Sequence, residues 1–317
     1  MPALREIGLS GVSGLRPTPV QQVVINNYFA HDELLNILQF VPIGMGNTLG
    51  NFVASFVISD GDVEATFREL GVNYEAENQN YNVETVQLKM LGGALNADRA
   101  VQRAFGAGST GLDTYTEGQI VQKLNAIKKA FAKWFILGNS KTDAKQFDGL
   151  EAKIKSTQIV TDALDFTDLD FSKAANVERG INYAIALMKK APTFWLTTRR
   201  GKSNLVTLNS IRYKGVETIN VNDMNYKACM GLPVVAVDDD CFKTEDTTNK
   251  MPVYGIYTND YDGIRVAIPN DLQIVDILRP QFLNGKVVQD GTCEMICAPI
   301  LVDRLAVCKF FIKDTVA

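Results

Sequence analysis

The sequence has few of the residues and loops that enzyme active sites use. Its 317 residues include a single histidine, His31, and contain neither a GxxxxGKS/T loop nor a GxGxxG loop. Such loops hold phosphate groups through backbone N–H groups, and histidine is the commonest general base. His31 precedes Asp32 and Glu33 at the expected start of a short helix, which favours a structural role for it. We therefore predict that the protein is not an enzyme and binds no cofactor.

Cysteine also points away from chemistry. The chain has five cysteines, an odd number, and no CxxC pair; they are Cys229, Cys241, Cys293, Cys297 and Cys308. A zinc site needs four ligands at compact spacing, and one histidine with these cysteine spacings does not supply them. We predict buried, reduced thiols and no metal site.

The sequence lacks a basic excess, a membrane-length apolar run and a secretory signal. Its net charge is −4 and its pI is near 5.2, whereas a protein that grips nucleic acid normally shows a basic excess. The longest apolar stretch, 300–312, is broken by three charged residues, and the N-terminus has no apolar h-region. We expect a protein that folds in a cytoplasm, touches no membrane and does not bind nucleic acid specifically.

Two acidic clusters leave one catalytic alternative open. The segments 60–64 and 238–240 each carry three carboxylates, which could hold a hard cation through oxygen ligands. Neither follows the EF-hand spacing, and turns or solvated loops are the favoured reading. A two-domain α/β metal-dependent enzyme is the alternative that these clusters would support.

The first third of the chain predicts extended elements that leave the body of the protein. Residues 1–30 are punctuated by Gly, Pro and Ser, which indicates an arm lying on a surface. A short helix is expected over 32–40, stopped by Pro42. Strands over 51–58 and 83–90 would form a hairpin whose tip of about two dozen residues exceeds the usual connection length, and such loops are usually functional.

A long amphipathic helix follows. Thr114–Glu117 fits a capping box, and Gly138-Asn139 marks the end. The apolar residues between them recur every three or four positions and form one stripe, Ile120, Leu124, Ile127, Phe131 and Trp134.

The second half has an α/β texture. Helices are predicted over 177–190 and 199–209, and strands over 193–198, 232–237, 292–300 and 305–312. Strands over 253–257 and 264–268 flank Asp260–Gly263, which predicts a further hairpin.

The order of short motifs resembles the major capsid protein of tailed bacteriophages, with the Hong Kong 97-type fold. The motifs are Gly92-Gly93 with Asp98, Phe147-Asp148-Gly149-Leu150, Gly231-Leu232-Pro233-Val234, Asp262-Gly263 and Ala298-Pro299. The resemblance implies an α+β fold with an N-arm (1–46), an extended E-loop (47–92), a P-domain with a spine helix (93–175, with a returning strand in 264–284) and an A-domain (176–263), whose end and C-terminal strand occupy 285–317.

The same resemblance implies a function. Such proteins self-assemble into hexamers and pentamers of an icosahedral shell around double-stranded DNA, with a scaffolding protein, a portal and decoration proteins as partners. The location would be the virion, after assembly in the host cytoplasm. An encapsulin-like nanocompartment shell shares the fold and is the second candidate.

Charge patterning suggests where subunits would meet. The expected hairpin tip carries Asp60, Asp62, Glu64, Glu69, Glu75 and Glu77 against one cation, Arg68. The polar face of the long helix carries Lys123, Lys128, Lys129 and Lys133, with no carboxylate between Gly118 and Thr142. Because the family lays the E-loop across the neighbouring P-domain, we predict an inter-subunit contact between these residues.

Overall fold

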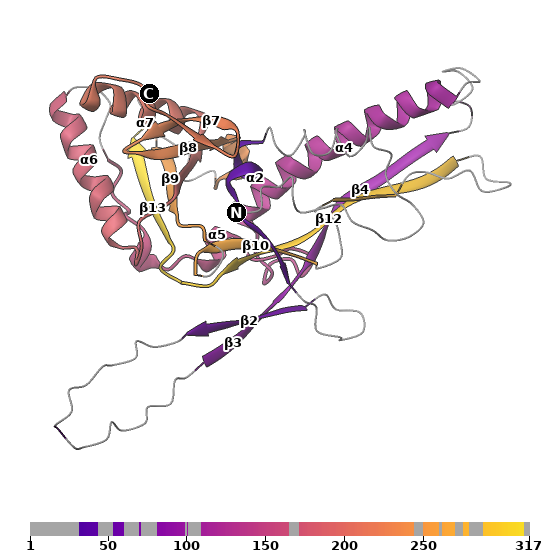
Figure 1. Ribbon diagram of the computed structural model, residues 1–317, viewed down its shortest axis with the longest axis horizontal. Helices are drawn as coiled ribbons and strands as arrows, with labels where there is room; N and C mark the ends of the chain where they lie inside the picture. Colours follow the sequence, from indigo (N-terminus) through magenta and orange to yellow (C-terminus); the bar gives the residue numbers. More distant parts are fainter. Residues whose placement is uncertain are drawn as a thin grey trace.

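The computed structural model describes residues 32–43, 53–59, 70, 81–98, 100, 109–164, 171–243, 250–259, 262–269, 275–278 and 288–313. His31 and the predicted tip residues Asp60, Asp62, Glu64, Arg68, Glu75 and Glu77 lie outside this range. The described residues form a mixed α+β fold, as predicted, with two large sheets and one separate two-stranded sheet (Figure 1).

One large unit, the central-sheet body, consists of a six-stranded sheet and two helices. In spatial order its strands are β13 (Val307–Lys313), β9 (Lys250–Ile256), β5 (Phe194–Thr198), β8 (Leu232–Val237), β7 (Met224–Cys229) and β6 (Thr218–Val221). Helices α6 (Phe171–Ala186) and α7 (Arg199–Tyr213) lie together on one side of it (Figure 1). The period of two along β5 sends Trp195 into the core beneath these helices, and Phe194 and Leu196 into a second core on the opposite face.

The second unit, the long-helix layer, joins α4 (Ser109–Leu137) to a sheet built around β12 (Val288–Leu301). The other strands of that sheet are β1 (Phe40–Ile43), β10 (Ile264–Pro269), β11 (Val275–Leu278) and β4 (Lys89–Asp98). β4 pairs with β12 over ten residues, and α4 runs along this ribbon (Figure 1). Four residues of the predicted stripe, Ile120, Leu124, Ile127 and Phe131, are buried, and the fifth, Trp134, packs against the core while partly buried. The stripe is therefore the core face of this helix.

Short elements connect the two units. Helix α2 (Glu33–Ile37) begins at its N-cap Asp32, whose carboxylate accepts from the backbone N–H groups of Leu34 and Leu35. Helix α5 (Leu150–Lys153) follows the end of α4, and the 3-10 helices η1 (Ser156–Gln158) and η2 (Asp239–Cys241) complete the connections.

Strands β2 (Val53–Ser59) and β3 (Tyr81–Gln87) form the hairpin that the sequence predicts. They pair antiparallel from Val53 opposite Gln87 to Ser59 opposite Tyr81, and belong to neither large sheet. The hairpin projects away from both units (Figure 1).

Three sequence predictions are wrong in detail. Helix α4 begins at Ser109, five residues before the predicted capping box, because a favourable cap does not prevent a helix from extending further. Pro42 does not stop a helix but lies inside β1, an edge strand that tolerates a missing N–H. The strands expected to form a hairpin over 253–268 enter different sheets: β9 pairs with β5 and β13, and β10 with β1 and β12.

The prediction that the cysteines are buried and form no disulfide is confirmed. All five are free and buried, and burial raises the pKa of every thiol, to about 12 for Cys229 and about 11 for Cys241. A raised pKa keeps a thiol protonated and unreactive near neutral pH.

Candidate assembly interface

The two units are joined by a buried ion cluster that sequence reasoning missed. Glu151 on α5 accepts from Lys309 of β13 at 2.5 Å and pairs with Lys243 at 2.7 Å; the Tyr254 hydroxyl of β9 also donates to it. The side chains of Glu151 and Lys309 are 9% and 3% exposed. Burial opposes ionisation of Glu151, but the hydrogen bonds from these three groups hold the pKa of its carboxyl below the usual range. This cluster fixes the long-helix layer to the central sheet.

The lysines predicted as an inter-subunit surface face their own chain in part. Lys129 forms ion pairs with Asp240 at 3.0 Å and with Asp238 at 3.5 Å, and Asp240 also feels the charge of Lys133. Burial lowers the pKa of Lys128, against the attraction of Asp32. Reversing Lys128 and Lys129 to glutamate would therefore disturb the subunit itself as well as any contact with a neighbour.

Lys123 occupies a different position. Its Nζ atom lies 2.9 Å from where a Cβ atom at Gly93 of β4 would be, so the lysine lies across this strand, although the end of its flexible side chain could shift. The other glycine of the motif, Gly92, is more constrained, because a Cβ atom there would lie 2.3 Å from the backbone oxygen of Cys293.

Each of the three aspartates in the segment 238–240 pairs with a cation of its own subunit. Besides Lys129, Arg199 pairs with Asp238 at 2.7 Å and Arg200 with Asp239 at 3.4 Å. Among the described residues, no three His, Cys, Asp or Glu side chains gather as a group that could hold a metal ion. Within the same part of the chain, no helix is both long and apolar enough to cross a bilayer.

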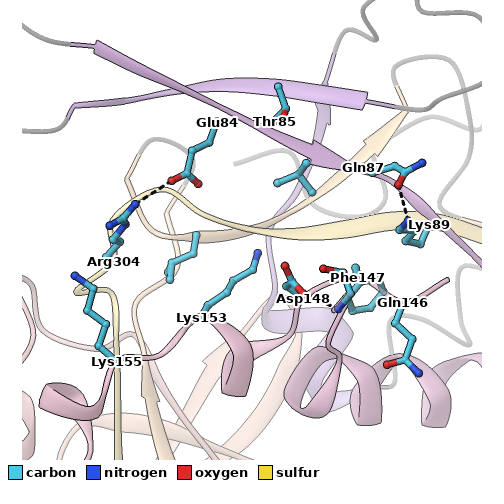
Figure 2. A pocket seen from close by; sticks show the side chains of 13 residues that line it. Glu84, Thr85, Gln87, Lys89, Gln146, Phe147, Asp148, Lys153, Lys155 and Arg304 are labelled. Carbon is cyan, nitrogen blue, oxygen red and sulfur yellow. Dashed lines mark hydrogen bonds and ion pairs between the residues drawn. The ribbon is translucent and has the colours of Figure 1, made fainter. Parts of the chain in front are cut away.

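A polar cleft of about 490 Å³ lies at the base of the hairpin, beside the turn that follows α4 (Figure 2). The cleft separates the residues of β3 from the turn and helix around α5, and its charged side chains are Glu84, Lys89, Asp148, Lys153, Lys155 and Arg304. Arg304 pairs with Glu84 at 3.2 Å across it, which ties the base of the hairpin to the segment between β12 and β13.

Few of the described side chains of the hairpin contact the core of their own subunit. Of its side chains that the structure describes, Val53 and 84–87, Val86 alone packs against the hydrophobic core. A two-stranded sheet is marginally stable by itself, and each open strand edge can pair with another chain. The hairpin therefore has the features of a segment that a partner completes.

Solved structures share this fold over nearly the whole chain. The encapsulin of the holo-SrpI complex from Synechococcus elongatus PCC 7942 superposes with a TM-score of 0.60 at 12% identity, covering 99% of this chain and 95% of its own. The capsid chain of a native GTA particle gives 0.57 at 13% identity over 96% and 94% of the two chains. A chain of Mycobacterium phage Bobi gives 0.54 at 12% identity over 88% and 89%. No protein-family model and no curated protein matches the sequence.

Proposed function

The chain has the Hong Kong 97-type fold that its motifs predict, and from this premise we propose that it is a major capsid protein. Subunits would assemble as hexamers and pentamers into an icosahedral shell that encloses double-stranded DNA without specific binding. The observation that carries the proposal is the hairpin, which projects from the body as an isolated two-stranded sheet. In a closed shell, heterologous contacts around each ring would cover such a segment on every subunit.

The proposal assigns the parts of the chain to the domains expected from the sequence. The hairpin strands are the E-loop (47–92), α4 is the spine helix of the P-domain (93–175), and most of the central sheet belongs to the A-domain. The acidic residues 60–77 of one subunit would contact the P-domain of the next, with Lys123, Lys128, Lys129 and Lys133 among the cations that they meet. Scaffolding, portal and decoration proteins would be partners during assembly in the host cytoplasm.

An encapsulin-like shell is the second candidate, and one observation favours it. The superposition on the Synechococcus encapsulin has the higher TM-score of the three comparisons and covers 99% of this chain. The two candidates differ in contents and not in fold, because one fold can serve several functions.

Electron microscopy of purified protein, combined with analysis of the particle contents, tests both. A capsid protein should give closed shells that take up DNA when expressed with its packaging partners. Shells with protein cargo and no DNA would favour the encapsulin. Monomers at high protein concentration would overturn both proposals.

A further inference from the structure

The cleft at the base of the hairpin carries cations that pair with no carboxylate among the residues that the structure describes. Lys89 donates to the side-chain oxygen of Gln87 at 2.6 Å and to the backbone oxygen of Ala144 at 2.7 Å. Lys155 is exposed, and none of the described contacts gives its ammonium group a partner. Of the four cations that line the cleft, Arg304 alone forms an ion pair within the described part of the chain, with Glu84.

Lys153 is the most enclosed of these cations. Its ammonium group donates at 2.5 Å to the backbone oxygen of Pro299, and its side chain points into the cleft between Glu84 and Asp148 (Figure 2). Burial lowers the pKa of Lys153 to about 8, and the attraction of these two carboxylates does not offset it. Asp148 in turn accepts from the backbone N–H of Ser140 at 2.7 Å. An enclosed ammonium group without a paired carboxylate is costly, and an incoming anion would stabilise it.

The chain supplies a suitable anion in the segment that joins β2 to β3. Residues 60–77 contain six carboxylates and one arginine. This segment begins after Ser59, at the opposite end of the hairpin from Glu84–Gln87, which line the cleft. Gln87 lies six residues along the strand from Tyr81, about 20 Å at the usual rise. The strands therefore place the two ends of the acidic segment at the far end of the hairpin from the cleft of their own subunit, which favours a segment from a second subunit as the occupant.

We propose that the cleft lined by Lys89, Lys153 and Lys155 receives carboxylates from residues 60–77 of a second copy of this chain. The inference rests on the proposed shell assembly and names its contact more closely. Lys129 and Lys133 lie beside Asp240 of their own subunit, so the cleft offers the less compensated cations. Charge complementarity at this site guides register between neighbouring subunits.

Carbodiimide cross-linking tests the contact, because the reagent joins a carboxylate to an amine that already touches it. Particles are assembled from an equal mixture of ¹⁴N- and ¹⁵N-labelled full chains, and the cross-linked peptides are identified by mass spectrometry. We expect mixed-isotope cross-links from residues 60–77 to Lys89, Lys153 or Lys155. Lys141 and Lys145, exposed on the turn beside the cleft, are the internal controls and should give few.

A second arm works even when no particle forms. A synthetic peptide of residues 59–82 is coupled to the unassembled full chain. The control peptide keeps the carboxylates that are meant to react and carries amides in place of the others. The acidic peptide should couple to Lys155, and about 1 M salt, where the Debye length is about 3 Å, should abolish coupling. Lys155→Met should remove that product, while Lys141→Met leaves it.

The two ideas fail differently. Failure to form particles, with the peptide still coupling to the cleft, would overturn the proposed shell alone. Particles whose cross-links from residues 60–77 are confined to a single isotope, or run to lysines outside the cleft, would overturn this contact alone. Protection of Lys89 and Lys155 by double-stranded DNA, with no coupling of the peptide, would overturn it in favour of a nucleic-acid surface.

Discussion

The strands of the central sheet and those of the hairpin differ in how far their own subunit pairs and buries them. In the central-sheet body every side chain of β5 is buried, the sheet has six strands, and two helices cover it. In the hairpin the two strands pair with each other and with no other strand of the described residues, and one described side chain reaches the core. The body is thus complete within one subunit, whereas the hairpin leaves backbone edges for another molecule. The difference separates residues that determine folding from residues that determine assembly.

Removing the hairpin should have the largest effect on assembly and little on folding. Residues 55–85 can be replaced by a short Gly-Ser linker, because Ala54 and Val86, which the linker would join, are partners across the strand pair and lie close together. We expect no particles by electron microscopy and a thermal unfolding midpoint close to that of the intact chain. Particles of normal size and yield from this variant would contradict the division between body and hairpin.

Glu151→Gln should destabilise the body most among single substitutions. Removing one partner of a buried ion pair costs about 3–5 kcal/mol, because Lys309 is left with an uncompensated charge. Glu178→Gln is the matched control: Glu178 pairs with Arg212 at 2.6 Å nearer the surface, and its loss should cost about 0–1 kcal/mol. Urea unfolding measures both, and equal losses would show that burial of the cluster carries no special weight.

The same carboxylate should make the free energy of unfolding depend on pH in the acid range. The folded pKa of Glu151 lies below its unfolded value, so its contribution is fully present above the unfolded pKa and is lost as pH falls through the folded one. Unfolding free energy should therefore fall below about pH 4, the ordinary range of a glutamate pKa. In Glu151→Gln the free energy of unfolding should fall less steeply as the pH is lowered. An unchanged slope of this free energy against pH would assign the acid sensitivity to other groups.

Replacing two glycines of the long-helix layer by alanine should change stability by smaller amounts and in opposite directions. A Cβ at Gly149 would lie 2.5 Å from the backbone oxygen of Trp134, so Gly149→Ala should cost about 1–3 kcal/mol through overpacking. Gly118 is exposed inside α4 with nothing within 4 Å, so Gly118→Ala should stabilise by about 0.5–1 kcal/mol. Thermal unfolding of both variants checks the opposite signs.

The smallest effect is expected at the base of the hairpin. Glu84 and Arg304 are 43% and 55% exposed, and such pairs contribute about 0–1 kcal/mol. Glu84→Gln should leave the unfolding midpoint of the free subunit nearly unchanged. A loss comparable to that of Glu151→Gln would mean that the hairpin is part of the folding core.

Local patterns in the sequence predicted much of this fold. The stripe from Ile120 to Phe131 identified the buried face of α4, and the order of short motifs identified the fold as a whole. Both signals depend on neighbours along the chain or on the order of segments, which the sequence displays directly.

Contacts between distant residues were not predictable in the same way. The pairing of Lys129 with Asp238 and of Glu151 with Lys309 joins positions more than one hundred residues apart, and no periodicity marks them. The turn signal at 260–263, of which residues 260 and 261 lie outside the described range, could not show that β9 and β10 belong to different sheets. The one sequence signal near Glu151 was the motif Phe147-Asp148-Gly149-Leu150, which Glu151 directly follows.

Hydrogen exchange of backbone amides tests the central comparison most directly. It should be measured on the free subunit and on assembled particles, and followed in β2 and β3 against β5 and β8. We predict that the β2 and β3 amides exchange quickly in the free subunit and become protected in the particle, while β5 and β8 are protected in both. Equal protection of all four strands in the free subunit, or no change in β2 and β3 on assembly, would contradict the account.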